Sequence, residues 1–465
     1  FMLNTIIMCL PWIDNYWFYI YNARNLFNFK FTRSSFMNRK VAAFLGRHNF
    51  SIHQDINSVV EAMLFDMNEG LSGRPSGEDM IRTYANPPSQ ATAGKSVIVI
   101  DAGGTNFRSC LVTFDSNGNP SIDFMEKTRM PGVDRELSKK EFFDQISANL
   151  EHLKDKSSSI GFCFSYPVDI QEDGDGVLIN FTKEVKAPEV EGSHIGKELE
   201  KALKEHGWKN KLHVSMLNDT VSALLAGAAD PDEGMKYSSY VGFILGTGMN
   251  SAYIQTASPE YKNLKTQIIN CESGKFDKVA RSDFDISFDK KSEKPGIGIM
   301  EKLCSGAYMG PIAFEAVTAA GKENLFSEKL SEKLSQLDSL TQIEMDSFLH
   351  APYSTNSKLG SIMAECAKDD DYDVLFQLLD ALVERCARMA AAILSACVIK
   401  SGEGKTADKP VCILCNGTSF FKTYKVRQRV LGYLEEILVK ERGLYFDVIS
   451  RENDITLGTA IGGLL

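Results

Sequence analysis

One stretch decides the predicted fold: Val97-Ile98-Val99-Ile100-Asp101-Ala102-Gly103-Gly104-Thr105-Asn106-Phe107-Arg108. Its four leading apolar residues predict a buried strand, and a second strand follows as far as Phe114. The two glycines let backbone N–H groups approach an anion, and Thr105 and Asn106 add further donors. Asp101, an acid at a strand end, stands where a metal-bound water is often held. The stretch therefore predicts a phosphate-binding turn or, alternatively, a purely structural hairpin.

A similar unit recurs further along the chain. There, strand 241–244 runs into Leu245-Gly246-Thr247-Gly248-Met249-Asn250, and a second strand follows to Ile254. When the two units are superposed, the residues are identical at the pairs 97/241, 100/244, 104/248 and 106/250. The repetition indicates two copies of one unit facing each other. Because strands and helices alternate along the chain, the fold class is α/β.

A third candidate site follows the expected strand 215–217. The next residues are Asn218-Asp219-Thr220, and an apolar helix is predicted over 221–229. Asp219 is then either only the N-cap of that helix or a carboxylate that faces a cleft as a general base. A fourth candidate is the strand Cys412–Cys415 with the polar loop Asn416-Gly417-Thr418-Ser419 behind it.

Other segments predict the surroundings of these sites. Apolar residues at helical spacing predict a helix from Ile56 that ends at Gly70, and a buried core helix over 373–399. Residues 86–94 indicate a connector. The mixed charge run 283–294 indicates a solvated loop.

Composition narrows the function classes. The chain has 465 residues, a net charge of −10 and 43% hydrophobic residues, which is ordinary for a soluble globular protein of two large or three smaller domains. An acidic balance argues against a nucleic-acid binder, which normally has a basic field. Ten cysteines are too sparse for a disulfide scaffold and indicate buried thiols.

The first 36 residues differ from the rest, with eleven aromatic side chains and one acid, Asp14. They contain no run of about 20 apolar residues that could cross a membrane. Three interpretations stay open: upstream sequence translated by mistake, an aromatic membrane-interface anchor, or a poorly ordered extension. Met37 is the expected start of the normal sequence.

In order along the chain, seven segments resemble motifs of the hexokinase family, and the resemblance extends from about residue 50 to the C-terminus. The segments are Ile98–Arg108 (first phosphate motif), Gly161–Pro167 with Asn180–Lys183 (sugar-binding signature), Leu217–Val221 (catalytic acid), Leu245–Asn250 (second phosphate motif), Ile269–Glu272 and Met300–Gly306 (sugar glutamates), and Asn416–Ser419 (adenosine loop).

The resemblance implies the fold: two actin-like (ribonuclease-H-like) α/β domains separated by a cleft for sugar and ATP, which closes on sugar. It also implies the partition of the chain. Residues 37–90 and 217–449 form the large domain, 91–216 and 450–465 form the small domain, and 1–36 form an extension of doubtful structure.

The resemblance implies the activity as well: transfer of the γ-phosphoryl group of ATP to the 6-hydroxyl of a hexose, the first step of glycolysis, with glucose as the main sugar and fructose or mannose as further candidates. Mg²⁺ would accompany ATP, held by its phosphates and water and by Asp101. Hexose and Mg-ATP would be the partners, with no nucleic acid or membrane, in a cytoplasmic monomer or homodimer.

The implied site has three parts. Asp219 would be the base, while Lys183 contacts the 6-hydroxyl and the transferring group and Arg108 stabilises phosphoryl charge. The sugar would be bound by Ser165, Thr182, Lys183, Asn218, Asp219, Asn250, Glu272 and Glu301. The nucleotide would be bound by Asp101, Gly103, Gly104, Thr105, Asn106, Gly246, Thr247, Gly248, Gly417, Thr418 and Ser419.

The sequence departs from the family pattern at five positions. Ser273 replaces an aromatic residue, Lys275 a small one, Pro311 and Asn416 an acid each, and Tyr166 a phenylalanine. None is the base or Lys183, so the chemistry should be kept, whereas Ser273 and Lys275 bear on sugar preference.

Three alternatives to a general hexokinase stay open: a kinase narrowed to one other sugar, a catalytically silent sugar sensor, and a structural actin-like protein. The acids Glu272 and Glu301 argue against a filament protein, and Asp219, Lys183 and Thr105 argue against a silent sensor.

Overall fold

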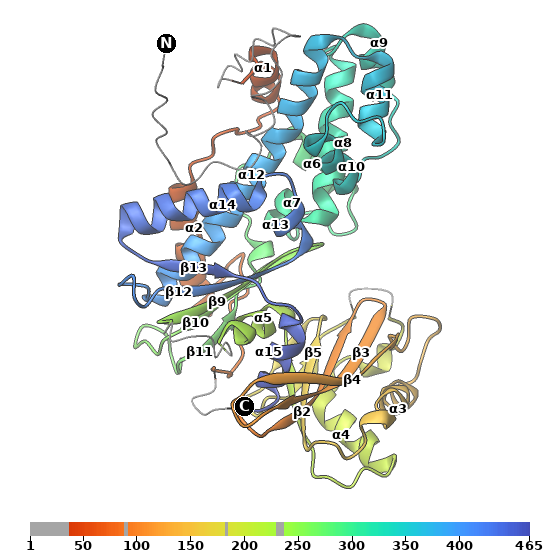
Figure 1. The fold of residues 1–465 in the computed structure, drawn as a ribbon, viewed down its shortest axis with the longest axis vertical. Coiled ribbons are helices and arrows are strands. Elements are labelled where there is room, and N and C mark those ends of the chain that lie inside the picture. The colour runs from red at the N-terminus through yellow and green to blue at the C-terminus, as the bar shows by residue number, and fades with distance from the viewer. Residues whose placement is uncertain (1–36, 88–91, 182–184, 229–236) are drawn as a thin grey trace, which may run out of the picture. The chain divides into compact units, whose positions relative to one another are not determined.

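The computed structural model describes residues 37–87, 92–181, 185–228 and 237–465 (Figure 1). Asn38–Leu465 is one compact unit. The open interpretations of residues 1–36 fall outside the described residues, as do the predicted sugar contacts Thr182 and Lys183.

One sheet has five strands in the order β4-β3-β2-β5-β8. The predicted hairpin is confirmed: β2 and β3 are antiparallel, and the turn 116–119 leads into β4. The strands β5 and β8 then add in parallel. The bounds are β2 (Ser96–Gly103), β3 (Asn106–Phe114), β4 (Pro120–Arg129), β5 (Ser159–Phe164) and β8 (His213–Leu217).

The other large sheet has six strands in the order β1-β11-β10-β9-β12-β13. Its glycine turn also joins two antiparallel strands, β9 and β10, and β12 pairs in parallel with the first of them, as β5 pairs with β2. The repeated unit read from the sequence is therefore repeated in the structure. The bounds are β1 (Ile81–Arg82), β9 (Ser239–Leu245), β10 (Met249–Gln255), β11 (Gln267–Asn270), β12 (Val411–Asn416) and β13 (Phe446–Ile449).

Two helices, α5 (Asp219–Ala228) and α15 (Asp454–Gly462), lie between the sheets (Figure 1). Helix α5 packs on β9 and β12, and α15 packs on α5, β2 and β5. One apolar cluster runs through all four layers, with Val97 and Val99 from the first sheet, Ile268 from the second, Leu224 from α5 and Leu457 from α15. Burial of this size is the main source of folding free energy, so the cluster fixes the start of α5, which carries the candidate residue Asp219.

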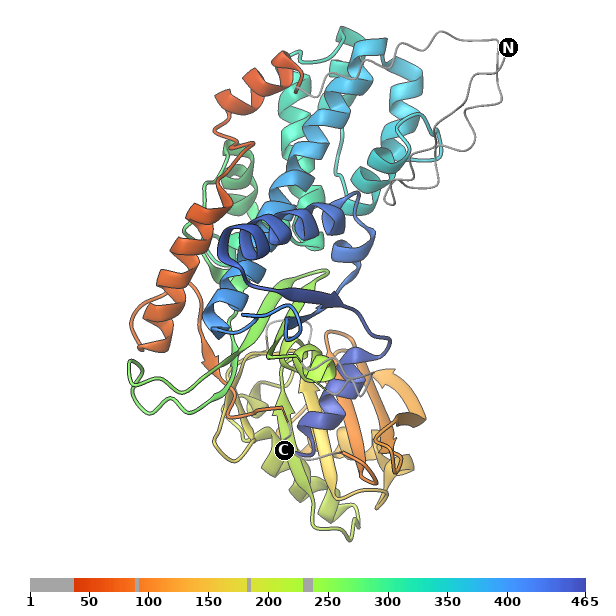
Figure 2. The same cartoon turned by 60° about the vertical axis from the view of Figure 1, so that its left-hand side comes forward.

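The outer faces carry the remaining helices. A second apolar cluster joins the five-stranded sheet to α3 and α4, while the long helix α12 packs on α2, α14, β9 and β10 (Figure 2). Helices α6 to α11 form a group packed beside α12. The bounds are α1 (Arg39–Arg47), α2 (Ile56–Leu71), α3 (Lys139–Asn149), α4 (Ile195–Glu205), α6 (Asp283–Lys291), α7 (Ile299–Cys304), α8 (Gly306–Lys322), α9 (Glu328–Ser335), α10 (Gln342–His350), α11 (Lys358–Cys366), α12 (Asp369–Ser401), α13 (Thr418–Lys422) and α14 (Val426–Leu434), with the short strands β6 (Val168–Ile170) and β7 (Gly176–Leu178).

One expectation was wrong. The charge run that indicated a solvated loop forms α6, whose first turn is stabilised by a capping box between Ser282 and Asp285. Asp285 is buried and accepts two hydrogen bonds from the buried guanidinium of Arg385 on α12, at 2.7 and 2.9 Å. A run of charges can form a packed helix when its acids have such partners. Helix α2 forms as predicted but ends at Leu71, one residue after Gly70, and Gly73 with φ +71° follows it.

No helix in the described part of the chain is long and apolar enough to span a bilayer. The nine cysteines that the structure describes are buried and free, as expected.

Candidate active site

The first glycine turn is an open two-residue hairpin. Strand β2 ends at Gly103 and β3 begins at Asn106, so that Gly104 and Thr105 form the loop. Gly104 has φ +57°, a conformation that favours glycine, and nothing lies within 4 Å of where its Cβ would be. The side chains of Thr105 and Asn106 are exposed. The turn thus presents exposed donor side chains at its tip.

The base of this hairpin is fixed by the segment after β5. The Ser165 N–H donates to the Ala102 carbonyl at 3.0 Å, and an added Cβ at Gly103 would lie 2.8 Å from the Ser165 hydroxyl. The Tyr166 hydroxyl donates to the Gly104 carbonyl at 3.1 Å. The predicted phosphate turn and the predicted sugar residue Ser165 are therefore in contact.

Asp101 lies at the end of β2 beside this turn. Its carboxylate pairs with the exposed Arg108 at 3.4 Å. Burial raises the pKa of Asp101, the charge of Arg108 opposes the rise, and the charge of Asp219 adds to it. The charges of Arg108 and Asp219 therefore both act on Asp101.

Asp219 is the first residue of α5, directly after β8. Its Oδ1 accepts the Thr220 N–H at 2.7 Å and the Thr220 hydroxyl at 3.2 Å, while Oδ1 of Asn218 accepts the same N–H at 2.8 Å. A helix N-terminus favours a negative charge, so both hydrogen bonds and the helix stabilise the ionised carboxylate. Asn218 is thus the N-cap of α5. Asp219 follows it at the carboxyl end of β8 and is half-buried.

Glu272, one of the two predicted sugar glutamates, follows β11 in a left-handed conformation, with φ +55°. Its Oε1 accepts hydrogen bonds from Asn270 at 2.9 Å and Asn250 at 3.3 Å, and Asn250 also donates to Oδ1 of Asn270 at 2.7 Å. Burial raises the pKa of Glu272, Lys275 and Asn270 oppose the rise, and Asp79 and Asp219 add to it. Asp219 thus reaches this part of the site as well.

The other glutamate, Glu301 on α7, is joined to the second glycine turn. Its Oε2 accepts the Met249 N–H at 3.0 Å, and an added Cβ at Gly248 would lie 2.8 Å from the same oxygen. Gly274, in the turn after Glu272, packs against the Glu301 side chain. Both glutamates therefore meet at the β9–β10 turn.

The second turn is closely packed on its other side. The Gly246 carbonyl accepts the Gly306 N–H at 2.8 Å and the hydroxyl of Ser419 at 2.9 Å. Gly417 has φ +111°, and an added Cβ would lie 2.2 Å from the Leu245 carbonyl oxygen. The predicted adenosine loop therefore contacts the second phosphate turn, with Thr247 and Thr418 exposed and Ser419 buried.

Two of the departures from the family pattern, Asn416 and Lys275, pair with acids elsewhere in the chain. Asn416 donates two hydrogen bonds to the buried Asp454 at the start of α15, at 2.8 and 2.6 Å, where an acid at 416 would face another acid. Lys275 pairs with Asp79 at 2.5 Å, and Pro311 lies inside α8. Ser273 is fully buried, and its hydroxyl has no hydrogen-bond partner among the described residues.

Sequence reasoning missed the role of Asn270. It stands two residues before Glu272, and on an extended strand such residues share a face. That spacing is the signal that could have identified it. In the structure its cross-strand neighbour is Ala252, two residues after Asn250.

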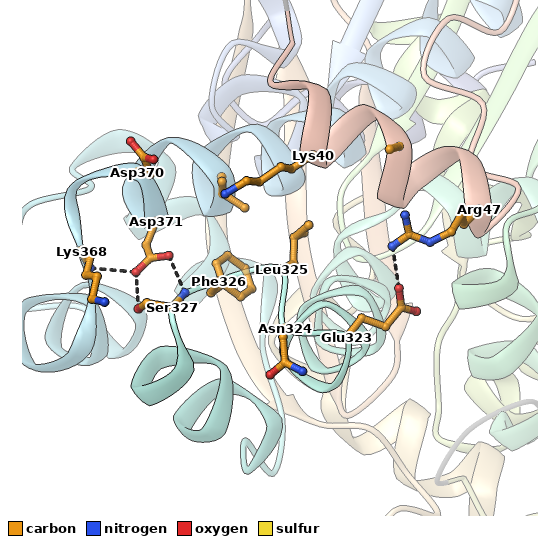
Figure 3. A pocket seen from close by; sticks show the side chains of 12 residues that line it. Lys40, Arg47, Glu323, Asn324, Leu325, Phe326, Ser327, Lys368, Asp370 and Asp371 are labelled. Carbon is orange, nitrogen blue, oxygen red and sulfur yellow. Dashed lines mark hydrogen bonds and ion pairs between the residues drawn. The ribbon is translucent and has the colours of Figure 1, made fainter.

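A pocket of about 760 Å³ lies away from these residues (Figure 3). Helix α1, the connection between α8 and α9 and the start of α12 line it, and charges of both signs surround it, among them Lys40, Arg47, Glu323 and Asp371. Arg47 pairs with Glu323 at 2.8 Å, and Ser327 donates to Asp371. It contains none of the predicted site residues.

Family models described as hexokinase match residues 44–229 and 240–465, nearly the whole described chain. Hexokinase-1 of Schizosaccharomyces pombe is 27% identical over 435 residues, which is 87% of this chain and 86% of that protein. Hexokinase-5 of Oryza sativa is 28% identical over 397 residues (79% and 77%), and glucokinase-1 of Kluyveromyces lactis is 28% identical over 391 residues (74% and 81%).

The fold matches solved hexokinase structures. A hexokinase from Schistosoma mansoni, complexed with glucose, has a TM-score of 0.74 at 24% identity and covers 92% of this chain and 98% of its own. Another hexokinase structure has a TM-score of 0.77 at 19% identity and covers 92% and 100%. The two sheets with their helices are therefore the two-domain actin-like ATPase fold, as the sequence predicted.

Proposed function

This chain belongs to the hexokinase family and is a hexose kinase whose substrates are a sugar and a nucleotide, and we propose that it transfers the γ-phosphoryl group of ATP to the 6-hydroxyl of glucose. Mannose and fructose are the further candidate sugars. We also assign it to the cytoplasm, as a monomer or homodimer. The observation that carries the proposal is the position of Asp219 at the start of α5, where its carboxylate accepts two hydrogen bonds from Thr220. Its charge also acts on the carboxyl groups of Asp101 and Glu272.

Asp219 acts as the base in this proposal. Its ionised form is stabilised by Thr220 and by the start of α5, so it takes the proton of the 6-hydroxyl only as that oxygen bonds to phosphorus. The bond between the γ-phosphorus and the bridging oxygen of ADP breaks in the same process. Arg108 and Lys183 offset the phosphoryl charge, because phosphoryl transfer depends mainly on positioning and charge neutralisation.

The remaining site residues hold the two substrates. Asn218, Asn250, Glu272, Glu301, Ser165 and Thr182 bind the sugar hydroxyls, and the carboxylates and amides are already oriented by Asn270 and by the Met249 N–H. The two glycine turns and the loop 417–419 bind the nucleotide. A carboxylate that is shielded from water and receives no hydrogen bond from the ligand raises the free energy of the complex. The site should therefore favour a sugar that places a hydroxyl group on each glutamate.

Mg²⁺ fits the donors present. Among the described residues no group of three or more acidic, histidine or cysteine side chains could hold a metal by itself. Mg²⁺ usually keeps several waters and binds one or two carboxylates together with substrate phosphates, and Asp101 beside the first turn matches that pattern. Asp101 would hold the ion through water. The ion would neutralise charge on the phosphates of ATP.

A coupled assay of ADP release across glucose, mannose, fructose and an amino sugar tests the activity. Asp219→Asn should lower kcat by about 10²–10⁴-fold, because a positioned base is lost, while glucose still binds. Asp55→Asn is the matched control, since Asp55 also accepts an N–H at a helix start but caps the remote helix α2. Its kcat should stay at the wild-type value. Near-normal turnover of Asp219→Asn, or no ADP release with any hexose, would refute the proposal.

A further inference from the structure

The turn that carries Glu272 is fastened to a distant segment by two ion pairs. Lys275 pairs with Asp79 at 2.5 Å, and Lys278 pairs with the buried Asp66 of α2. Asp66 also accepts the N–H groups of Gly77 and Glu78, at 2.8 Å each. The residues after Glu272 are thus joined to α2 through Asp66 and to the segment between α2 and β1 through Asp79.

The turn itself has little freedom. Glu272 is left-handed, the Ser273 N–H donates to Asn250 Oδ1 at 3.3 Å, and an added Cβ at Gly274 would lie 2.8 Å from the Met249 carbonyl oxygen. Lys275 lies in the same turn as the half-buried Glu272, because its N–H donates to the Glu272 carbonyl at 2.9 Å, although its own side chain is exposed. Position 275 is also one where the sequence departs from the family pattern.

The pair with Asp79 contributes little to global stability. The side chains of Lys275 and Asp79 are 42% and 40% exposed. Exposed ion pairs of this kind have small effects on folding, because water and salt screen them. Their effect on the half-buried carboxylate of Glu272 is less screened, so the pair matters mainly for Glu272.

We propose that Lys275 and Asp79 are positioning residues that set the charge state of Glu272, with Lys275 keeping the carboxylate ionised for sugar binding and Asp79 limiting that effect. This inference rests on the proposed sugar-binding role of Glu272. An ionised carboxylate accepts hydrogen bonds on both oxygens, and its hydrogen bonds with sugar hydroxyls are stronger than those of the protonated acid.

The electrostatics around Glu272 agree with this assignment. Burial raises the pKa of Glu272, Lys275 is the largest opposing influence, and Asp79 acts in the direction opposite to Lys275. The other charged groups that face it are Asp219 at the start of α5, which also raises its pKa, and Glu301 of α7, which packs on the same turn. Sugar binding should therefore weaken as the pH falls through the pKa of Glu272.

The test is the affinity for glucose, measured by calorimetry at a series of pH values that extends into the acidic range. Lys275→Met should raise the pKa of Glu272, so that glucose binding is lost at a higher pH, by about half a unit. Asp79→Asn leaves Lys275 unopposed and should move the loss to a lower pH. Lys275→Arg keeps the charge and should retain the wild-type profile.

A charge reversal separates electrostatics from simple anchoring. In the double variant Lys275→Glu with Asp79→Lys an ion pair can still form, but the negative charge is now on the turn of Glu272. The inference predicts a shift to higher pH, whereas anchoring alone predicts the wild-type profile. All variants alter exposed side chains, so thermal melting should confirm intact folding, and Asp79→Asn alone would suffice as a test.

Shifts of the same sign for Lys275→Met and Asp79→Asn, or no shift in either, would overturn the inference while the wild-type enzyme still phosphorylates glucose. Failure of the wild-type chain to bind or phosphorylate any hexose would overturn the proposed function first, and the inference with it.

Discussion

The two glycine turns come from the same sequence pattern, yet they are held in different ways. At the β2–β3 turn, the glycine is needed for its backbone: Gly104 has φ +57° and open space around it. At the β9–β10 turn, the glycine is needed for its size: Gly248 lies against the Glu301 carboxylate. The first turn, the proposed phosphate site, is therefore an exposed tip, whereas the second is part of the packing that orients Glu301, a proposed sugar contact.

This difference suggests how the two substrates affect each other. The Met249 N–H of the second turn donates a hydrogen bond to Glu301. A movement of that turn would therefore displace the Glu301 carboxylate, which is a proposed sugar contact. The first turn is hydrogen-bonded to Ser165 and Tyr166, which belong to the predicted sugar-binding signature. Substitutions in the second turn should therefore affect sugar binding most.

The largest effect is expected for Gly248→Ala. Its Cβ would lie 2.8 Å from Oε2 of Glu301, so the carboxylate must move. We expect KM for glucose to rise by about 10²-fold, since a displacement of about 1 Å in a positioned group can cost that much. The measurement is a steady-state titration of glucose at saturating ATP.

Gly246→Ala is the control in the same turn. Its Cβ would meet only the Gly417 Cα, at 3.6 Å, which is ordinary contact. KM for glucose should stay within a few-fold of wild type. Equal effects of the two substitutions would show that the β9–β10 turn does not orient Glu301.

A smaller effect is expected for Gly104→Ala in the first turn. No atom obstructs the new methyl group, but the left-handed conformation costs a non-glycine residue about 1–2 kcal/mol. The free energy of unfolding, measured with urea, should fall by that amount, and KM for ATP should rise more than KM for glucose.

Gly104→Asn separates strain from size, because asparagine tolerates the left-handed region better than alanine does. It should be less destabilising than Gly104→Ala although it is larger. The reverse order would mean that space, rather than backbone conformation, selects glycine at this turn.

Much of the fold followed from local patterns. Four consecutive apolar residues and two glycines predicted β2 and its hairpin, and helical spacing predicted α2 and the core of α12, because these elements are fixed by which face they bury. The order of the motifs supported the family resemblance, which implied that these segments share one cleft. In the structure, Ser165 contacts the first turn and Glu301 contacts the second.

The rest depends on partners that are distant in the sequence. Asp285 lies in a helix, not in a loop, because Arg385, 100 residues later, neutralises it in the core. The pairs Lys275–Asp79 and Asn416–Asp454 likewise join segments that no local pattern connects. The partition into a large and a small domain stays a prediction, as do the sugar and nucleotide contacts of single residues.

The smallest effect is expected for Tyr166→Phe, which removes the hydrogen bond to the Gly104 carbonyl. Losing one such bond costs about 0.5–1.5 kcal/mol, and the carbonyl lies at a turn that solvent reaches, so the lower end applies. The family pattern has phenylalanine at this position, which agrees with a minor role. The bond fixes the exposed turn and not Glu301, so KM for ATP should rise by a few-fold while KM for glucose stays unchanged.

Ser157→Ala is the matched control: its hydroxyl donates to the Ser96 carbonyl at 2.7 Å, at the opposite end of β2, and its loss should change stability alone. A rise in KM for glucose in Tyr166→Phe that equals the rise for ATP would mean that the two turns are coupled more tightly than their packing indicates.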